Sequence, residues 1–202
     1  MAQTVPTKGN LMAVKKSLSL ALVGYDLMDK KRNILIRELM ALIDKSKELQ
    51  ATIDDAFAAA YRALEKANIT LGFCDEISKT IPLDNSITLD SRSIMGVEIP
   101  LLHIDRPGQR NLQYGLGNTN ARLDETVALF TRAKELTVEL AQVENSVYRL
   151  TVAIKKTQKR ANALKNIMIP RFEEEVKFIS DALDEKDREE FSRLKVIKKQ
   201  QS

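Results

Sequence analysis

The chain has 202 residues, of which 30% are charged and only 5% are aromatic, and its formal net charge is +4. This composition suits a long helical protein better than a compact enzyme. No apolar stretch of 18 residues occurs, so the sequence predicts no membrane-spanning helix. One cysteine, Cys74, cannot form an internal disulfide, and a reducing cytoplasm is the expected compartment.

Residues 8–71 follow the heptad pattern of a long helix. Apolar positions recur at alternating steps of three and four from Leu11 to Ala67, and proline is absent from this stretch. Side chains at such steps lie along one face of a helix, where a partner helix can cover them. We therefore expect one helix of about 90 Å, at 1.5 Å per residue, with an apolar seam.

Residues 119–198 are expected to form a second long helix with its own seam. Near Pro170 the alternation gives way to three successive steps of four, which join Leu164, Met168, Phe172 and Val176. Such a stutter locally unwinds a supercoil, and the proline removes one backbone hydrogen bond. Two interpretations are open: a tolerated, exposed kink, or a junction between two packing regimes.

The segment 72–118 between the arms lacks helical periodicity and is rich in proline and glycine. Polar and apolar residues alternate over 86–90 and again over 97–99, as they do in half-exposed strands. We predict a short β-hairpin at about 86–104. Pro100 must then occupy an edge position or a bulge. A lone hairpin is marginal in water, so this one is expected to rest on the helices or on another subunit.

These elements predict a mainly α fold: a long antiparallel two-helix coiled coil of the N- and C-terminal helices, with a short β-hairpin and loops in the middle. Its three parts are an N-terminal helix (8–71), a central segment (72–118) and a C-terminal helix (119–198). Folding back near residue 95 pairs positions whose numbers add to about 190. Residues beyond about 182 then form a basic overhang without a partner arm.

Catalysis, metal binding and cofactor binding are not predicted. The chain lacks a phosphate loop, a dinucleotide-binding glycine pattern, paired metal ligands and a nucleophile elbow. His103 is the only histidine, and no cysteine or acid near it in sequence completes a ligand or catalytic set. A hairpin of helices also offers little concavity for a substrate. The expectation is a non-catalytic chain.

Positive charge is concentrated in the second helix. Residues 145–172 contain seven bases and no acid, whereas residues 173–190 contain nine acids and three bases. Four of these bases lie outside the seam in the heptad register: Lys155, Lys156, Lys159 and Arg160. A solvated helix face explains any one of them. A cluster of one sign, however, creates a field that an acidic partner or a phosphate backbone could use.

Both arms resemble one family at unusual strings of residues. Residues 154–164 read Ile-Lys-Lys-Thr-Gln-Lys-Arg-Ala-Asn-Ala-Leu and residues 169–171 read Ile-Pro-Arg. Residues 183–195, and in the other arm residues 27–32, Leu-Met-Asp-Lys-Lys-Arg, continue the pattern. The chain thereby resembles the D subunit of the V-type and archaeal-type rotary ATPases. It departs from the family at Lys165, where an acid is frequent, and this adds basic charge without disturbing the seam.

The resemblance implies a central rotor subunit. Such a rotor couples ATP hydrolysis or synthesis in a catalytic hexamer of A and B subunits to rotation of the membrane ring that translocates ions. The implied partners are the A and B subunits, the small F subunit, and a socket subunit that leads to the ring. Nucleic acid is not an expected partner. The implied location is the cytoplasmic face of the membrane, within the ATPase complex and without direct insertion.

Two sets of side chains are the candidate functional residues. A rotor must pass several stator positions without being trapped, and exposed bases facing acidic loops give long-range, shallow interactions. We expect hexamer contacts from Lys8, Lys15, Lys16, Lys155, Lys156, Lys159, Arg160, Arg188, Arg193 and Lys195. We expect a regulatory role for four apolar side chains of the hairpin, which are Ile87, Leu89, Val97 and Ile99.

Two other functions are compatible with parts of the sequence. A cytosolic coiled-coil tether or scaffold without a motor would have the same composition and periodicity. A nucleic-acid-binding module could use the basic run 145–172, but that run lacks interleaved aromatic residues, and the acidic run beside it would repel phosphate.

Overall fold

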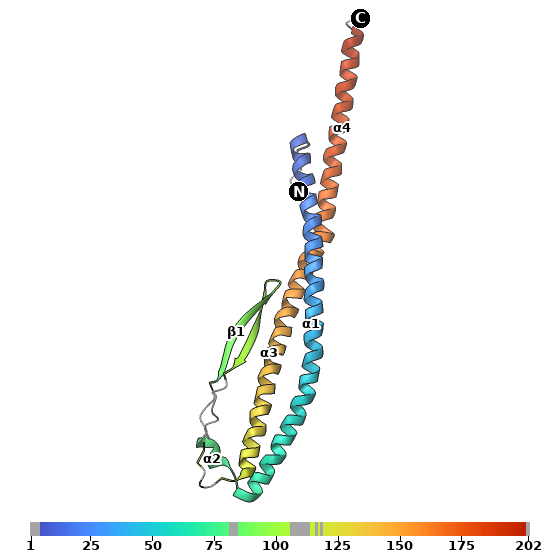
Figure 1. Ribbon diagram of the computed structural model, residues 1–202. Coiled ribbons are helices and arrows are strands. Elements are labelled where there is room, and N and C mark those ends of the chain that lie inside the picture. Colours follow the sequence, from blue (N-terminus) through green and yellow to red (C-terminus); the bar gives the residue numbers. More distant parts are fainter. Residues whose placement is uncertain (1–4, 81–84, 106–113, 116, 118, 201–202) are drawn as a thin grey trace. The chain divides into compact units, whose positions relative to one another are not determined.

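A computed structural model describes residues 5–80, 85–105, 114–115, 117 and 119–200 of the chain. Two long helical arms flank a two-stranded antiparallel hairpin in the sequence (Figure 1). The elements in chain order are α1 (Lys8–Leu71), α2 (Asp75–Thr80), β1 (Ile87–Ile94), β2 (Val97–Ile104), α3 (Ala121–Ala163), the π-helix η2 (Leu164–Met168) and α4 (Ile169–Gln200). The predicted mainly α class and the hairpin are confirmed. Across the described part of the chain, every helix is too short or too polar to cross a membrane.

The chain divides into two compact units, and each contains a piece of both arms. The first unit combines residues 1–34 with residues 154–202, and the second comprises residues 35–153. Because α1 is one continuous helix, it contributes its first part to one unit and the remainder to the other.

The seam predicted for α1 is the face that this helix buries. All of its buried residues occupy seam positions, and they are Val14, Ala21, Leu35, Ile53, Ala60, Ala63 and Ala67. Removing apolar surface from water contributes roughly 25 cal/mol per Å². Leu35 is the largest side chain on this face that is fully buried, and it therefore contributes most.

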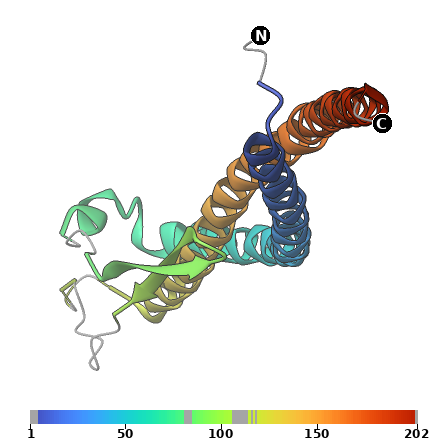
Figure 2. The ribbon, with the colours of Figure 1, turned by 90° about the horizontal axis from the view of Figure 1, so that it is seen from above.

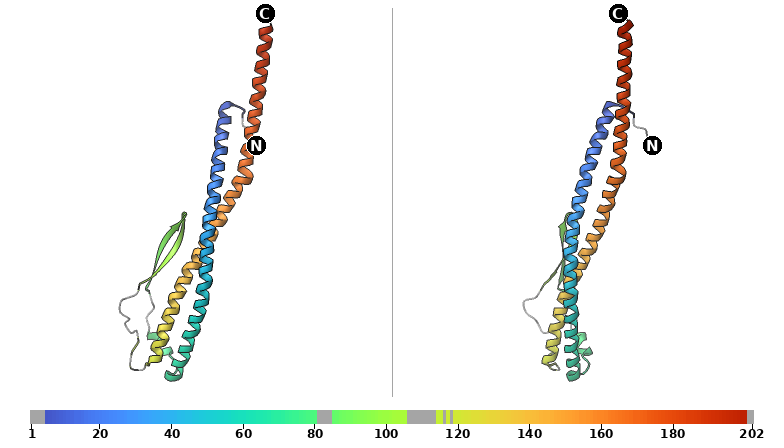
Figure 3. Two further views of the ribbon diagram at one scale, coloured as in Figure 1. Left: turned by 45° about the vertical axis from the view of Figure 1, so that its right-hand side comes forward. Right: turned by 90° about the vertical axis from the view of Figure 1, so that its right-hand side faces the viewer.

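In the first unit the two arms run antiparallel. The Arg32 guanidinium donates a hydrogen bond to the Gln158 side-chain oxygen at 2.8 Å, and Lys165 Nζ lies 5.8 Å from the centroid of the Tyr25 ring. Both views of Figure 3 show the early part of α1 beside the helix that leads into α4. The residue numbers of each pair add to about 190, as the seam predicts.

The second unit repeats this antiparallel pairing with other residues. Lys45 forms an ion pair with Glu139 at 2.6 Å, and the rings of Tyr61 and Phe130 meet edge to face with centroids 5.4 Å apart. The residue numbers of these two pairs add to 184 and 191. The sums differ because long side chains reach partners that are a turn or more away along the helix. The predicted fold-back is therefore confirmed within each unit separately.

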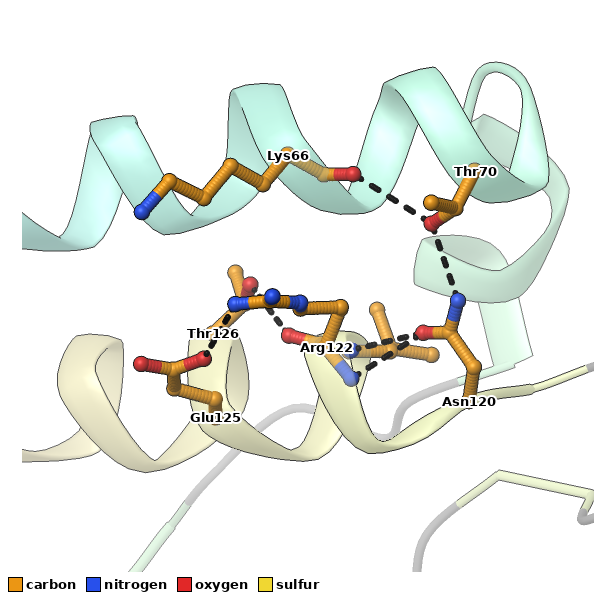
Figure 4. Close-up of polar contacts among 7 residues, drawn as sticks. Lys66, Thr70, Asn120, Arg122, Glu125 and Thr126 are labelled. Carbon is orange, nitrogen blue, oxygen red and sulfur yellow. Dashed lines mark hydrogen bonds and ion pairs between the residues drawn. The ribbon is translucent and has the colours of Figure 1, made fainter.

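The end of α1 is tied to the start of α3 by one asparagine (Figure 4). Asn120 Oδ1 accepts hydrogen bonds from the backbone N–H groups of Arg122 and Leu123, both at 3.1 Å, which caps α3. Its Nδ2 donates to Thr70 Oγ1 at 2.9 Å. A single side chain thus satisfies a helix terminus and joins the two arms.

The segment before α3 contains two features that the sequence analysis did not anticipate. One is the short helix α2, in a region where no helical period is visible. The other is Tyr114, which is buried and donates a hydrogen bond from its hydroxyl to Asp124 Oδ1 at 2.6 Å. Burial, followed by the interaction with Asp124, raises the pKa of Tyr114 to about 12, so the phenol remains a donor at neutral pH.

The hairpin has a two-residue turn, and its strands pair from Ile94 with Val97 to Ile87 with Ile104. Met95 and Gly96 occupy the turn with φ values of 51° and 73°. Two positive φ angles define a type I′ turn, which matches the twist of paired strands. Methionine is an unusual residue there, because side chains other than Asn or Asp rarely adopt positive φ.

The stutter of the second arm is built as a π turn. In η2 the N–H of Ile169 donates to the carbonyl of Leu164, a spacing of five residues instead of the four of an α-helix. Ile169 is 8% exposed, whereas Met168 is 36% exposed. The prediction that Met168 belongs to the seam is therefore wrong. Ile169 occupies that place, because the wider turn adds one residue.

This geometry decides between the two interpretations of Pro170. The seam continues through half-buried Phe172 to Ile179, which is fully buried. A five-residue step therefore restores alternating steps of three and four on both sides of the π turn. Pro170 follows directly and removes a backbone donor from the next turn. The site is a junction between two stretches of regular seam.

Deleting one residue of η2 tests this interpretation. Without the exposed Ile167, the five-residue step becomes four and the heptad becomes continuous. We expect the helix content by circular dichroism to persist and the midpoint of denaturant unfolding to stay or rise.

The matched control removes exposed Glu144 from the regular part of α3. Residues after this deletion rotate away from the seam, including fully buried Leu150, and the free energy of unfolding should fall by more than about 3 kcal/mol. Equal destabilisation by both deletions would contradict a junction role for η2.

Candidate functional site: a basic helix face and a docked hairpin

The ten bases predicted to contact a hexamer are all exposed, and all belong to the first unit. They lie on three helical segments. Lys8, Lys15 and Lys16 are on the first turns of α1; Lys155, Lys156, Lys159 and Arg160 are on the last turns of α3; and Arg188, Arg193 and Lys195 are on α4. The four hairpin side chains belong to the second unit.

The four bases on α3 form the most concentrated group, here named the α3 basic face (Lys155, Lys156, Lys159 and Arg160). On the same turns, Thr157 and Ala161 are buried in the seam. The helical period therefore directs Lys155 and Lys159 away from the seam and places Lys156 and Arg160 on its exposed flank. Within the described residues, these four form no ion pair and no side-chain hydrogen bond. Their charge is available to a partner.

The other bases of the acid-free run have internal partners. Arg149 donates to the backbone carbonyl of Glu98 at 3.2 Å, and Lys165 lies over the Tyr25 ring. Arg171 forms an ion pair with Glu175 at 3.0 Å. The fold thus divides the run 145–172 into three engaged bases and the α3 basic face, a division that the sequence does not reveal.

The bases on α4 are partly compensated by neighbours on the same helix. Arg188 and Arg193 lie 3.9 and 3.6 Å from the carboxylates of Glu185 and Glu189. Lys195 lies 4.9 Å from the centroid of the Phe191 ring. Every residue from 184 to 200 is exposed, so no other described part of the chain covers this end of α4.

An exposed apolar stripe on α1 was missed by the sequence analysis. Met12, Leu20, Val23 and Leu27 are all exposed. With Lys16 they follow steps of four, four, three and four, which place them on one helix face away from the seam. The same three- and four-residue spacing of these apolar residues could have revealed the stripe in the sequence. It was overlooked because the seam pattern on the other face of α1 is stronger.

The four candidate hairpin residues do not form one surface. Opposite residues of an antiparallel pair share a face, and Leu89 pairs with Leu102 while Arg92 pairs with Ile99. Leu89 is 74% exposed on one face, whereas Ile99 is 8% exposed on the other. Ile87 lies on the face of Leu89, and Val97 lies on the face of Ile99.

An open hollow lies between β2 and α3. Its lining includes Leu102 and Ile104 from the strand and Leu136 and Gln142 from the helix. His103 also lines it, but the described residues contain no group of three or more side chains suited to a metal ion. The hollow and the α3 basic face offer charge and apolar contact, which are the chemistry of binding surfaces.

Comparison with known proteins identifies the lineage of the chain. The profile of the ATP synthase D subunit matches residues 10–199. The chain belongs to the ATP synthase D-subunit family. Within this family, the D subunit of the V-type ATP synthase of Thermotoga neapolitana is 44% identical to it, over 96% of each chain.

Archaeal relatives show the same correspondence. The D subunits of the A-type ATP synthases of Thermococcus kodakarensis and Pyrococcus furiosus are 34% and 35% identical to this chain, over 96% of it and 92% of each relative. The predicted resemblance of both arms is confirmed, and the matches also extend through the central segment. The chain is a stalk component of a rotary ATPase, and other subunits of that complex are its partners.

Proposed function

We propose that this chain is the central rotor shaft that couples ATP hydrolysis or synthesis in an A/B hexamer to rotation of an ion-translocating ring. The observation that supports this most directly is the antiparallel pairing of the arms in each unit, in a member of the D-subunit family. Torque transmission requires a stiff element, and two helices packed along a common seam resist bending better than one helix.

The chain's role in this machine is non-catalytic. It binds the A and B subunits, the F subunit and a socket subunit, and it holds no cofactor. Nucleotide chemistry resides on the A and B subunits, and ion translocation resides on the ring and its stator. The location is peripheral, on the cytoplasmic face of the membrane. A tether without a motor remains the alternative, and family membership does not favour it.

The first unit is the part that enters the hexamer. Its exposed α3 basic face, with Lys8, Lys15 and Lys16 of α1, contacts acidic loops of the stator subunits as the shaft turns. Long-range attraction between exposed charges varies little with small rotations, so it holds the shaft without fixing one angle. The exposed apolar stripe of α1 (Met12, Leu20, Val23 and Leu27) adds short-range apolar contact on one face of that helix.

The hairpin of the second unit regulates the machine. Ile87 and Leu89 present exposed apolar surface on one face, while Val97 and Ile99 belong to the face that is more covered. An exposed apolar face on a small sheet is a surface for a partner. The hairpin therefore modulates ATPase rate or partner docking and is not required for pairing of the arms.

Charge removal on the α3 basic face tests the hexamer contact. The wild-type chain, together with the F subunit, should bind the A/B hexamer and support its ATPase activity. The variant with Lys155, Lys156, Lys159 and Arg160 all changed to Gln should bind roughly tenfold more weakly at low salt, as expected for several weak surface pairs. The difference should shrink at high salt, where exposed charges are screened.

A control with the same loss of charge changes four exposed bases on the part of α1 in the second unit, which are Arg37, Lys47, Arg62 and Lys66. It should bind the hexamer like wild type. Unchanged affinity of the first variant at low salt would contradict the contact. Failure of the wild-type chain to enter the hexamer would contradict the rotor function.

Removal of the hairpin tests its regulatory role. A short glycine-serine linker in place of residues 86–104 should leave helix content and the unfolding midpoint of the chain nearly unchanged, because the seam residues lie on the helices. The ATPase rate of the reconstituted complex should change. Loss of the helical signal would show that the hairpin holds the arms together, which contradicts the proposal.

A further inference from the structure

The hairpin meets α3 through one edge of β2. The Asp105 N–H donates to the Ser86 carbonyl at 2.8 Å, which identifies the pairs that exchange hydrogen bonds within the hairpin. Counting along the strand in steps of two, the backbone groups of Glu98, Pro100 and Leu102 point away from β1. These three residues form the outer edge of β2.

Side chains of α3 satisfy this edge at two points. Gln142 Oε1 accepts a hydrogen bond from the Leu102 N–H at 2.8 Å. Arg149 Nη1 donates to the Glu98 carbonyl at 3.2 Å. Pro100, between them, has no N–H that needs a partner, which also explains how β2 accommodates a proline. Figure 1 and Figure 2 show the hairpin alongside α3.

Gln142 and Arg149 are placed for this task by the helix itself. They are seven residues apart, which is two turns, so both project from nearly the same face of α3. Their contacts run in opposite order along β2, because Gln142 meets the later residue Leu102 and Arg149 meets the earlier residue Glu98. The strand therefore lies antiparallel to the helix and is held near both ends.

Apolar burial adds little to this attachment. In the two strands, Ile99 is the only buried residue, and most of β1 is exposed on both faces. The hollow between β2 and α3 is open. The helical arms differ, since α1 alone buries seven side chains along its seam. Two hydrogen bonds and one buried side chain form a weak attachment that can open without loss of the seam.

We propose that the hairpin is a detachable element, held against α3 by a two-point latch of Gln142 and Arg149, and that it alternates between docked and released states as one cooperative unit. Release exposes Ile99 and unpairs the Leu102 N–H. A free two-stranded hairpin is marginal in water, so the released hairpin also loses its own ladder. This inference concerns the isolated chain and does not depend on the rotor function.

Hydrogen–deuterium exchange on the full-length chain measures the release. Leu101 and Ile99 donate within the ladder, so their amides report opening of the hairpin without being latch bonds themselves. Gln142→Leu keeps the size of the side chain and removes the acceptor, and Arg149→Leu removes the donor. Each should speed exchange of the ladder amides by about five-fold, and the double variant by about 25-fold.

Two controls isolate the latch from other effects. Gln142→Glu retains an acceptor oxygen and should leave the ladder amides as protected as in wild type. Arg160→Leu removes the same charge from an exposed position further along α3 and should also change nothing in the hairpin. Amides of α1 and α3 should exchange as in wild type in all of these variants.

If the hairpin is released as one cooperative unit, loss of one anchor should speed amide exchange along the whole hairpin. If the two anchors act separately, exchange should change only beside the anchor that is lost. Arg149 contacts the strand near the turn, yet Arg149→Leu should also speed exchange at His103, at the other end of β2. Exchange that changes only beside the altered anchor, or not at all, overturns the proposal. Exchange that accelerates equally in α1 and α3 overturns it too, because the hairpin would then be part of the helical core.

Discussion

The structure depends on one constraint, which is that each arm must bury a narrow apolar seam against the other. Neither helix has a core of its own, and all buried residues of α1 lie on that seam. Antiparallel pairing within one molecule satisfies both arms and brings positions such as Arg32 and Gln158 together. It also leaves much of the other faces of the helices exposed, so that binding surfaces can form there without disturbing the packed seam.

The π turn η2 follows from the same constraint. The spacing of apolar residues in the second arm shifts by one position near Pro170, and a regular α-helix would turn the later seam away from α1. The additional residue of η2 absorbs this shift, so Ala161 before it and Ile179 after it are both buried. A π turn within a long helix is frequent at functional positions. Here its structural role is to join two regular stretches.

The two kinds of candidate surface depend differently on this scaffold. The α3 basic face is a direct product of helical periodicity, since all four of its bases fall outside the seam positions Thr157 and Ala161 and are exposed. The hairpin is an addition to the scaffold, attached through Gln142 and Arg149 with little apolar burial. The charged surface therefore lies on the packed helices. The proposed conformational freedom belongs to the hairpin, which contributes no residue to the seam.

The heptad spacing of apolar residues made much of the fold and of the basic face predictable from the sequence. The bounds of α1, its buried seam, the numbering of paired residues and the exposure of the basic face all follow from steps of three and four. Heptad counting could not distinguish Met168 from Ile169, because apolar residues stand at both positions and only backbone hydrogen bonds decide. The latch was equally inaccessible, since Arg149 binds a carbonyl oxygen that any residue at position 98 would supply. The apolar stripe of α1 was visible in the sequence but was concealed by the stronger pattern.

Distance measurement between paired spin labels tests the intramolecular pairing of the arms most directly. With Cys74 changed to Ser, labels at positions 45 and 139 probe the second unit, and labels at positions 30 and 160 probe the first. Each pair should give one short, narrow distance that persists when labelled chain is diluted with unlabelled chain. A long or broad distance in either unit, or a short distance that disappears on dilution, would contradict an axle formed by one folded-back molecule.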